Sequence, residues 1–406
     1  MSRSGGIVGS ADTEDQVRTI DVGTPPERYA RGWHCLGLVR DFADGKPHQV
    51  DAFGTSLVVF AGEDGKLNVL DAYCRHMGGN LAQGSVKGNT IACPFHDWRW
   101  RGDGKCAEIP YARRVPPLAR TRTWPVAEVS GQLFVWHDPQ GSKPPAELAV
   151  PEVPTYGDPG WTDWVWNSIE VTGSHCREIV DNVVDMAHFF YVHYGMPTYF
   201  RNVFEGHTAT QVMWSLPRAD AVGVSQTTNY SAESRSDATY YGPSYMIDKL
   251  WSAGRDPESP PNIYLINCHY PISPTSFRLQ YGVMVERPEG VPPEQAEQIA
   301  QAVAQGVAIG FEQDVEIWKN KSRIDNPLLC EEDGPVYQLR RWYEQFYVDV
   351  EDIRPEMVNR FEYEIDTTRA LTSWQAEVDE NVAAGRSAFA PNLTRAREAA
   401  SAESGS

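Results

Sequence analysis

Short apolar segments separated by turn residues fill the first third of the chain. Two pairs of such segments flank dipeptides typical of tight turns: residues 56–61 and 67–71 around Asp64-Gly65, and residues 126–129 and 132–136 around Ser130-Gly131. Strand-length apolar segments on both sides of a Gly-containing turn predict antiparallel hairpins. We therefore expect a small all-β domain over residues 21–138.

A different pattern follows a Pro- and Gly-rich stretch at 139–159, which we interpret as a domain boundary. Residues 174–193 predict a helix, with Ser174 as its cap and Gly195 and Pro197 as stop signals. Two strands and a long helix are then predicted in this order: 263–269, 277–286 and 292–321. The expected fold class is α+β, with a second domain at 160–386 in which helices partner an antiparallel sheet.

The two ends, residues 1–20 and 387–406, are small, polar and aperiodic, and we expect them to be mobile. The net charge of −19, without a basic patch, argues against nucleic acid and against anionic membrane surfaces as partners. The longest apolar run, residues 57–61, is far below the ~18 residues of a membrane span. No signal peptide is visible, so the expected location is the cytoplasm.

The seven cysteines are an odd number spread over a long chain, which argues for reduced thiols and metal ligands over a disulfide framework. Cys74-Arg-His76 is followed after sixteen residues by Cys93-Pro-Phe-His96. Zinc sites usually take a Cys pair followed by a His pair, whereas here each loop supplies one of each. This arrangement suits a two-iron two-sulfur (2Fe-2S) cluster in which one iron takes both thiolates and the other both imidazoles.

On these four residues the chain resembles the Rieske family over residues 21–138. The resemblance implies that Cys74 and Cys93 bind one iron and that His76 and His96 bind the other. Rieske proteins of respiratory complexes carry a loop disulfide, where this chain has Gly79 and Phe95, and a Ser where it has Trp98. A low-potential cluster of the oxygenase type is implied, with Trp98 and Trp100 packed beside it.

A second metal site is expected in the predicted helix, which reads Asp181-x3-Asp185-x2-His188-x4-His193. The spacing predicts that Asp181, Asp185 and His188 share one helical face, with the two carboxylates as partners of the metal-binding histidines. Five residues at about 100° each rotate His193 by about 140° from His188. Both histidines can therefore reach one metal only if the helix distorts or ends between them.

The third ligand is predicted to come from the long helix. Its apolar stripe reads Ile299, Val303, Val307, Phe311, Asp314, Ile317 and Trp318. Asp314 would thus be buried, and a buried carboxylate needs either a salt bridge or a metal. With two histidines lacking a third ligand, metal is the better interpretation. Two His and one Asp form the facial triad of non-heme iron(II) oxygenases.

Both motifs together resemble the α-subunits of Rieske non-heme iron oxygenases over about residues 20–380. The resemblance implies a helix-grip catalytic domain that holds one mononuclear Fe(II), alongside one 2Fe-2S cluster per subunit. It also implies a head-to-tail homotrimer, in which the cluster of one subunit faces the lone iron of its neighbour. Asp185 matches the catalytic carboxylate that bridges the two centres.

Several stretches are similar to the 3-ketosteroid 9α-hydroxylase branch of that family: 73–79, 93–100, 185–191, 200–207, 313–318, 323–329 and 337–350. The similarity implies insertion of one oxygen atom of O2 at C9 of a 3-ketosteroid such as androstenedione or its 1,4-diene. A separate NADH-dependent flavin and iron–sulfur reductase would supply electrons. The implied substrate wall is Val183, Gln211, Tyr240, Met246, Asn267, Phe311 and Trp318.

Two other interpretations stay open at this point. The iron motifs alone also fit another Rieske oxygenase, such as an aromatic-ring dioxygenase or a sterol desaturase. A zinc-stabilised, non-catalytic ligand-binding protein built on a helix-grip cavity is the alternative from a different class.

Overall fold

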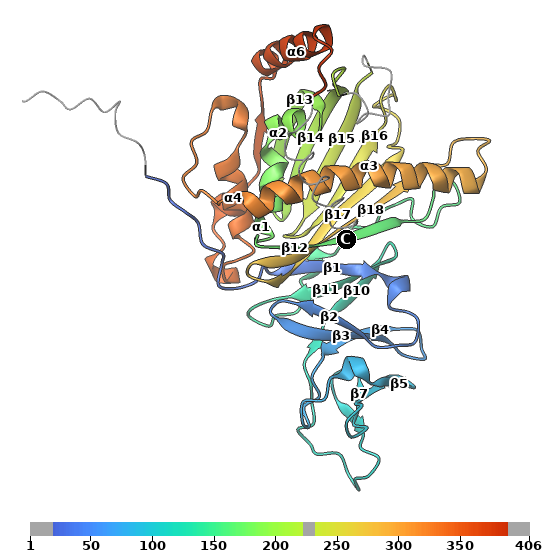
Figure 1. The fold of residues 1–406 in the computed structure, drawn as a ribbon. Coiled ribbons are helices and arrows are strands. Elements are labelled where there is room, and N and C mark those ends of the chain that lie inside the picture. Colours follow the sequence, from blue (N-terminus) through green and yellow to red (C-terminus); the bar gives the residue numbers. More distant parts are fainter. Residues whose placement is uncertain (1–18, 222–231, 389–406) are drawn as a thin grey trace, which may run out of the picture.

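The computed structural model describes residues 19–221 and 232–388, so the expected mobile ends lie almost wholly outside the described residues. The first part of the chain consists of three small antiparallel sheets (Figure 1). Their strands are, sheet by sheet, β1 (Gly32–Leu38), β11 (Gln132–His137) and β10 (Val126–Val129); β2 (His48–Ala52), β3 (Thr55–Ala61), β4 (Leu67–Asp71) and β9 (Thr123–Trp124); β5 (Ser85–Lys87), β6 (Thr90–Ala92), β7 (Arg99–Arg101) and β8 (Cys106–Glu108).

The second part is built on one eight-stranded antiparallel sheet with the order β12-β18-β17-β16-β15-β14-β13-β19. Its strands are β12 (Val165–Thr172), β13 (Gly195–Glu205), β14 (Thr208–Pro217), β15 (Ser234–Tyr241), β16 (Tyr245–Trp251), β17 (Ile263–Ser273), β18 (Ser276–Val285) and β19 (Phe361–Glu364). Its helices are α1 (Arg177–Val180), α2 (Met186–Tyr191), α3 (Pro293–Asn320), α4 (Val336–Glu344), α5 (Pro355–Val358) and α6 (Thr368–Ala383). The predicted α+β class is confirmed.

Both predicted hairpins are present, as β3–β4 and β10–β11. Their turns need residues in the left-handed region: Gly65 has φ +76°, and Ser130 and Gly131 have φ +49° and +76°. Glycine adopts this conformation without a Cβ clash, which is why these positions end the strands so sharply.

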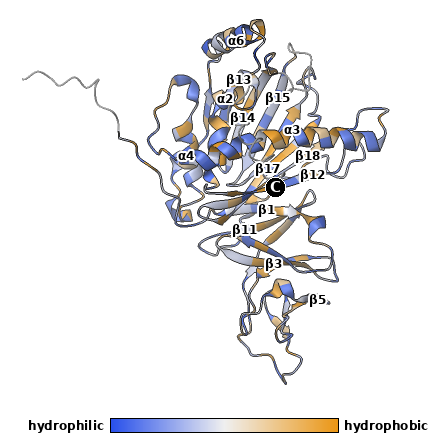
Figure 2. Ribbon diagram, in the orientation of Figure 1, coloured by the Kyte–Doolittle hydropathy of each residue, from blue (hydrophilic) through white to orange (hydrophobic). Residues whose placement is uncertain are grey.

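The large sheet is buried on both faces, and alternation along β16 divides its side chains between them. Tyr245 and Ile247 pack on the sheet that contains β1 and β11, and the Tyr245 ring stands edge-on to Phe134 at 4.9 Å between centroids. Met246 and Asp248 point to the opposite face, across which α3 lies (Figure 1). Figure 2 shows hydrophobic residues on β17 and β18 beneath that helix.

The long helix α3 forms as predicted and starts with a proline at its first position. Phe311, Asp314 and Trp318 are buried, as the stripe requires, but Ile317 is 40% exposed. Val315 takes the inner position instead, since a 3.6-residue period places 311, 315 and 318 closer to one line than 317. No described helix is long and apolar enough to cross a membrane.

The prediction of one helix over residues 174–193 is wrong. The segment forms α1, a 3-10 turn (Asp181–Val184) and α2, and it breaks at Asp185, which has extended backbone angles. The Asp185 side chain accepts a hydrogen bond from the His188 backbone N–H and so caps α2. Asp181 therefore does not share a helical face with His188; it forms ion pairs with Arg323 and Arg340.

Candidate metal centres and their cavity

Two loops at the tip of the first domain bring together the four residues predicted to bind the cluster. The first loop closes with a hydrogen bond from the Cys74 N–H to the Gly79 carbonyl, and the second with one from the Cys93 N–H to the Trp98 carbonyl, both 2.9 Å long. Each turn places one Cys and one His at its end. The rings of His76 and His96 lie 4.8 Å apart between centroids.

The surroundings of these residues fit a bound cluster. A Cβ on Gly79 would lie 2.7 Å from the Cys93 sulfur, so the loops leave room for nothing larger than glycine there. Trp100 Nε1 donates to the Cys74 sulfur at 3.3 Å, and Trp98 stacks on His76.

His96 adds a sign of a missing partner. Its Nδ1 atom is buried and has no hydrogen-bond partner among the described residues. A buried ring nitrogen without a partner is costly unless something binds it, which suits an iron ligand.

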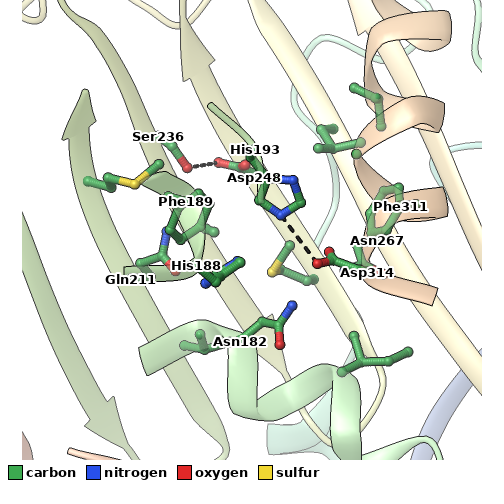
Figure 3. A pocket seen from close by; sticks show the side chains of 18 of the residues that line it. Asn182, His188, Phe189, His193, Gln211, Ser236, Asp248, Asn267, Phe311 and Asp314 are labelled. Carbon is green, nitrogen blue, oxygen red and sulfur yellow. Dashed lines mark hydrogen bonds and ion pairs between the residues drawn. The ribbon is translucent and has the colours of Figure 1, made fainter. Parts of the chain in front are cut away.

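The predicted facial triad also comes together. The ligand atoms of His188, His193 and Asp314 all lie within 4.8 Å of one another, and His193 Nε2 is 3.3 Å from Asp314 Oδ1 (Figure 3). The two histidines meet because α2 ends between them at Tyr191. The expected distortion between the two histidines is thus observed, and α3 brings Asp314 in from the other side.

Hydrogen bonds orient both imidazoles. His188 Nδ1 contacts the Asp185 carbonyl oxygen, and His193 Nδ1 lies 3.3 Å from Gln313 Oε1. A ring that donates from Nδ1 presents its Nε2 lone pair, which is the arrangement of metal-binding histidines. The contact of Gln313 with His193 was not predicted from the sequence. The position of Gln313 next to Asp314 on the buried face of α3 could have indicated it.

The charges of the site act on each other. Burial lowers the pKa of His193, but the Asp314 carboxylate outweighs it and the pKa lies above its usual value. Burial raises the pKa of Asp185, whereas the hydrogen bonds and charge of His188 bring it below the usual value. The Asp185 side chain is nevertheless 49% exposed, so this carboxylate reaches the surface.

A cavity of about 260 Å³ lies between the sheet, α2 and α3, with the triad in its wall (Figure 3). All seven residues predicted to contact substrate line it: Val183, Gln211, Tyr240, Met246, Asn267, Phe311 and Trp318. The remaining walls are mainly apolar and include Ile179, Phe189, Met213, Leu250, Leu265 and Val307. Such a lining with few polar groups is typical of sites for apolar small molecules.

Asp248 and Ser236 line the same cavity and were missed by sequence reasoning. The signal was present in β16, where Asp248 alternates with Met246 and Leu250 and therefore shares their face. An acidic residue at an inward-facing strand position is uncommon enough to mark a functional candidate.

Family models match most of the chain. The Rieske 2Fe-2S domain matches residues 32–125, and the 3-ketosteroid 9α-hydroxylase C-terminal domain matches residues 135–347. A probable 3-ketosteroid-9-alpha-monooxygenase oxygenase component of Rhodococcus rhodochrous is 99% identical over 98% of this chain and 100% of its own. A second such component from that organism is 63% identical over 92% of this chain and 95% of its own.

Solved structures agree on the fold. Dicamba monooxygenase bound to dicamba superposes with a TM-score of 0.60 at 20% identity, covering 78% of this chain and 97% of its own. Identity at this level speaks for the fold alone, whereas the sequence matches extend to both domains. The chain belongs to the family of 3-ketosteroid-9-alpha-monooxygenase oxygenase components.

Proposed function

We propose that this chain is the terminal oxygenase of a Rieske monooxygenase that hydroxylates 3-ketosteroids at C9α, using O2 and electrons from NADH. The observation that carries the proposal is the triad of His188, His193 and Asp314 in the wall of an apolar cavity. Two histidines and one carboxylate bind one face of an iron(II) ion and leave positions open for dioxygen. The steroid substrate is supported by the family match, which includes 99% identity to a named oxygenase component.

Each domain has its own part in the proposal, with limits at 21–138 and 160–386. In the first, Cys74, Cys93, His76 and His96 would hold the 2Fe-2S cluster, which passes electrons one at a time. In the second, His188, His193 and Asp314 would hold a mononuclear Fe(II), which supplies dioxygen activation when bound.

The side chains around the triad have positioning roles. The Asp185 carbonyl and Gln313 Oε1 accept from the Nδ1 atoms of His188 and His193 and so fix the ring orientation. The apolar walls, with Phe311 and Trp318 from α3, exclude water and hold a flat apolar substrate beside the triad. Substrate position, set by these walls, then decides which carbon is attacked.

We also propose a head-to-tail homotrimer. Asp185 is half exposed although it is bonded to a triad histidine, which suits contact with another subunit. Large apolar side chains are exposed near both centres, including Met77 and Phe95 at the cluster tip and Tyr191 on α2. Basic residues stand at the tip, such as Arg75, and acidic ones stand in the 3-10 turn Glu331–Asp333 beside α2. Unlike patches of this kind suit a head-to-tail contact, which forms a closed ring when the rotation between subunits closes.

The partners proposed are an NADH-dependent flavin and iron–sulfur reductase, the 3-ketosteroid and O2. The named relatives are oxygenase components, which supports a separate reductase. The cytoplasm is the proposed location, because it supplies NADH and keeps the cluster-binding thiols reduced.

A direct experiment combines the purified chain, a cognate reductase, NADH and androstadienedione. We expect a 9-hydroxylated or ring-opened steroid, formed with one O2 consumed per product. NADH consumption with unchanged steroid would point to another Rieske oxygenase activity, such as that of a sterol desaturase. A colourless protein that holds zinc and no acid-labile sulfide would overturn the oxygenase proposal and favour the zinc-stabilised binding protein.

A further inference from the structure

The cavity contains an acidic side chain that the proposed reaction has not used. Asp248 lines the cavity, is 7% exposed and forms no ion pair with any described cation. Among the described residues its side chain has one hydrogen-bond partner, Ser236 Oγ, which donates to Asp248 Oδ1 at 2.8 Å (Figure 3). A carboxyl group in a mainly apolar cavity carries a large cost, so its presence there calls for a binding role.

The sheet register gives the position of this pair relative to the other polar residues of the cavity wall. Ser236 and Tyr240 face the cavity from the same strand, four residues apart, which is about 13 Å at 3.3 Å per residue. Tyr240 is level with Met246 and Asn267 across the strands, and Asp248 is level with Ala238. The hydroxyl of Tyr240 and the Oδ1 of Asn267 are buried without a partner among the described residues.

Ser236 and Tyr240 thus lie two cavity-facing positions apart along β15, with Ala238 between them, whereas Asp248 lies one such position, about 7 Å, from Met246 along β16. Met246 and Leu250, the cavity-facing neighbours of Asp248 on β16, are apolar, and Gln211 on β14 is level with Ala238 and also lines the cavity. A substrate with a ketone at this wall would pair with the acid, whereas a plain hydrocarbon would leave it unpaired.

We propose that the Ser236–Asp248 pair binds a ketone oxygen of the substrate. This inference rests on the proposed steroid substrate. A ketone oxygen only accepts hydrogen bonds, so the pair must present a donor. Ser236 donates to Asp248, and the protonated Asp248 carboxyl donates to the ketone.

The environment of Asp248 favours this protonation state. Burial raises its pKa to about 7, with Ser236 opposing the shift and the nearby Asp237 adding to it. The same principle keeps carboxylic acids neutral and donating in other apolar sites. The other titratable groups that face the cavity are His188 and His193 from α2 and its end, Asp314 from α3 and Tyr240 from β15.

The test compares three variants of the full-length protein, loaded with its metals. Asp248→Asn keeps an N–H donor in the same place, Asp248→Leu removes the donor, and Lys249→Leu changes the exposed neighbour on the same strand as a control. Dissociation constants are measured by equilibrium dialysis for androstadienedione and for two analogues, one without the C3 ketone and one without the C17 ketone.

We expect Asp248→Leu to weaken androstadienedione binding by about tenfold, the worth of one lost hydrogen bond to a buried group. That loss should vanish for the analogue lacking the anchored ketone and persist for the other. Asp248→Asn should bind within about threefold of the wild type, and Lys249→Leu like the wild type. The same loss for all three steroids, or no loss at all, would overturn the inference.

A pH series tests the inference even if the Asp248→Leu variant does not fold. Wild-type binding of androstadienedione should weaken between pH 6 and 8, as Asp248 loses its proton, and binding by Asp248→Asn should not. Parallel pH profiles of the two proteins would contradict the inference. The proposed function is tested separately by product formation in the wild type. Ketone-dependent binding without 9-hydroxylation would contradict the proposed function but would still support ketone binding by the Ser236–Asp248 pair.

Discussion

At the scale of single residues, Gly79 decides whether the cluster loops can close. Its Cα faces the Cys93 sulfur, and an added methyl group would stand 2.7 Å from it, well inside van der Waals contact. If the sulfur is held in place as a cluster ligand, as proposed, the loop must move instead. Alanine at this position is therefore expected to separate the two halves of the proposed cluster site.

We predict that Gly79→Ala loses most of the visible absorbance and acid-labile sulfide of the cluster while the second domain keeps its iron. Gly306→Ala is the control, since Gly306 lies exposed in α3 with open space around it. That change should keep the cluster and stabilise the helix by about 0.5–1 kcal/mol. Iron and sulfide analysis would contradict the prediction if Gly79→Ala bound a full cluster.

Asp248 gives a prediction on stability. Its pKa is raised by burial to about 7 in the folded protein, against a usual value near 4. Between these values the folded protein holds a proton that the unfolded chain has released, so stability falls as the pH rises from about 4 to about 7. Asp248→Asn removes this titration and should raise the melting temperature more at pH 8 than at pH 5. An equal change at both pH values in thermal melts would refute it.

The sequence predicted these residues unevenly, for physical reasons. The cluster ligands follow from a local spacing, and Asp314 follows from helical phase, because both are set by nearby residues. The prediction that Asp181 is a partner of the metal-binding histidines was wrong. Its actual partners, Arg323 and Arg340, are more than a hundred residues away in the sequence. Asp248 was missed because its significance depends on the strands on either side of β16.

At the scale of elements, the network around Asp181 holds the broken helix segment in place. Arg340 Nη2 lies 2.7 Å from Asp181 Oδ2, and Arg323 Nη1 lies 3.4 Å from it. Arg323 also pairs with Glu178 of α1. All four side chains are at least four-fifths buried. The network thus ties α1 and the 3-10 turn to α4 and to the segment that follows α3.

Asp181→Ala should destabilise the protein by about 3 kcal/mol, because it leaves a buried guanidinium without its partner. The exposed Arg360–Glu205 pair offers a matched comparison, and Arg360→Ala should cost less than about 1 kcal/mol. Thermal melts measure both. The Asp181 variant should also hold less mononuclear iron, since the 3-10 turn precedes the α2 ligand. Equal shifts in the two variants would show that the network is not a strong support.

At the scale of the whole molecule, the two proposed centres lie far apart within one chain. Figure 1 shows β5 and β7 at one end of the molecule and α2 within the large sheet domain at the other. Asp185, the N-cap residue of α2, has a side chain that is 49% exposed. Electron transfer between centres in the same chain would have to cross the whole of the first domain, whereas a neighbouring subunit could place its cluster against Asp185.

If Asp185 is the bridge, Asp185→Asn should keep both metals and lose nearly all turnover. Asparagine preserves the cap of α2, because its side-chain oxygen still accepts from the His188 N–H. Iron content and the reduced-cluster spectrum then match the wild type while product formation does not. Loss of the mononuclear iron in this variant would instead identify Asp185 as a ligand.

The proposed trimer predicts that two inactive variants restore activity together. His188→Ala removes a triad ligand and keeps the cluster, whereas His96→Ala removes a cluster ligand and keeps the triad. When the two are co-expressed, half of the subunits carry an intact triad and half of those face a neighbour with an intact cluster, so about one quarter of wild-type turnover returns in a random head-to-tail ring. The variants purified separately and mixed without subunit exchange serve as the control. If the co-expressed mixture stays as inactive as that control, electrons pass within one chain and the proposed assembly is wrong.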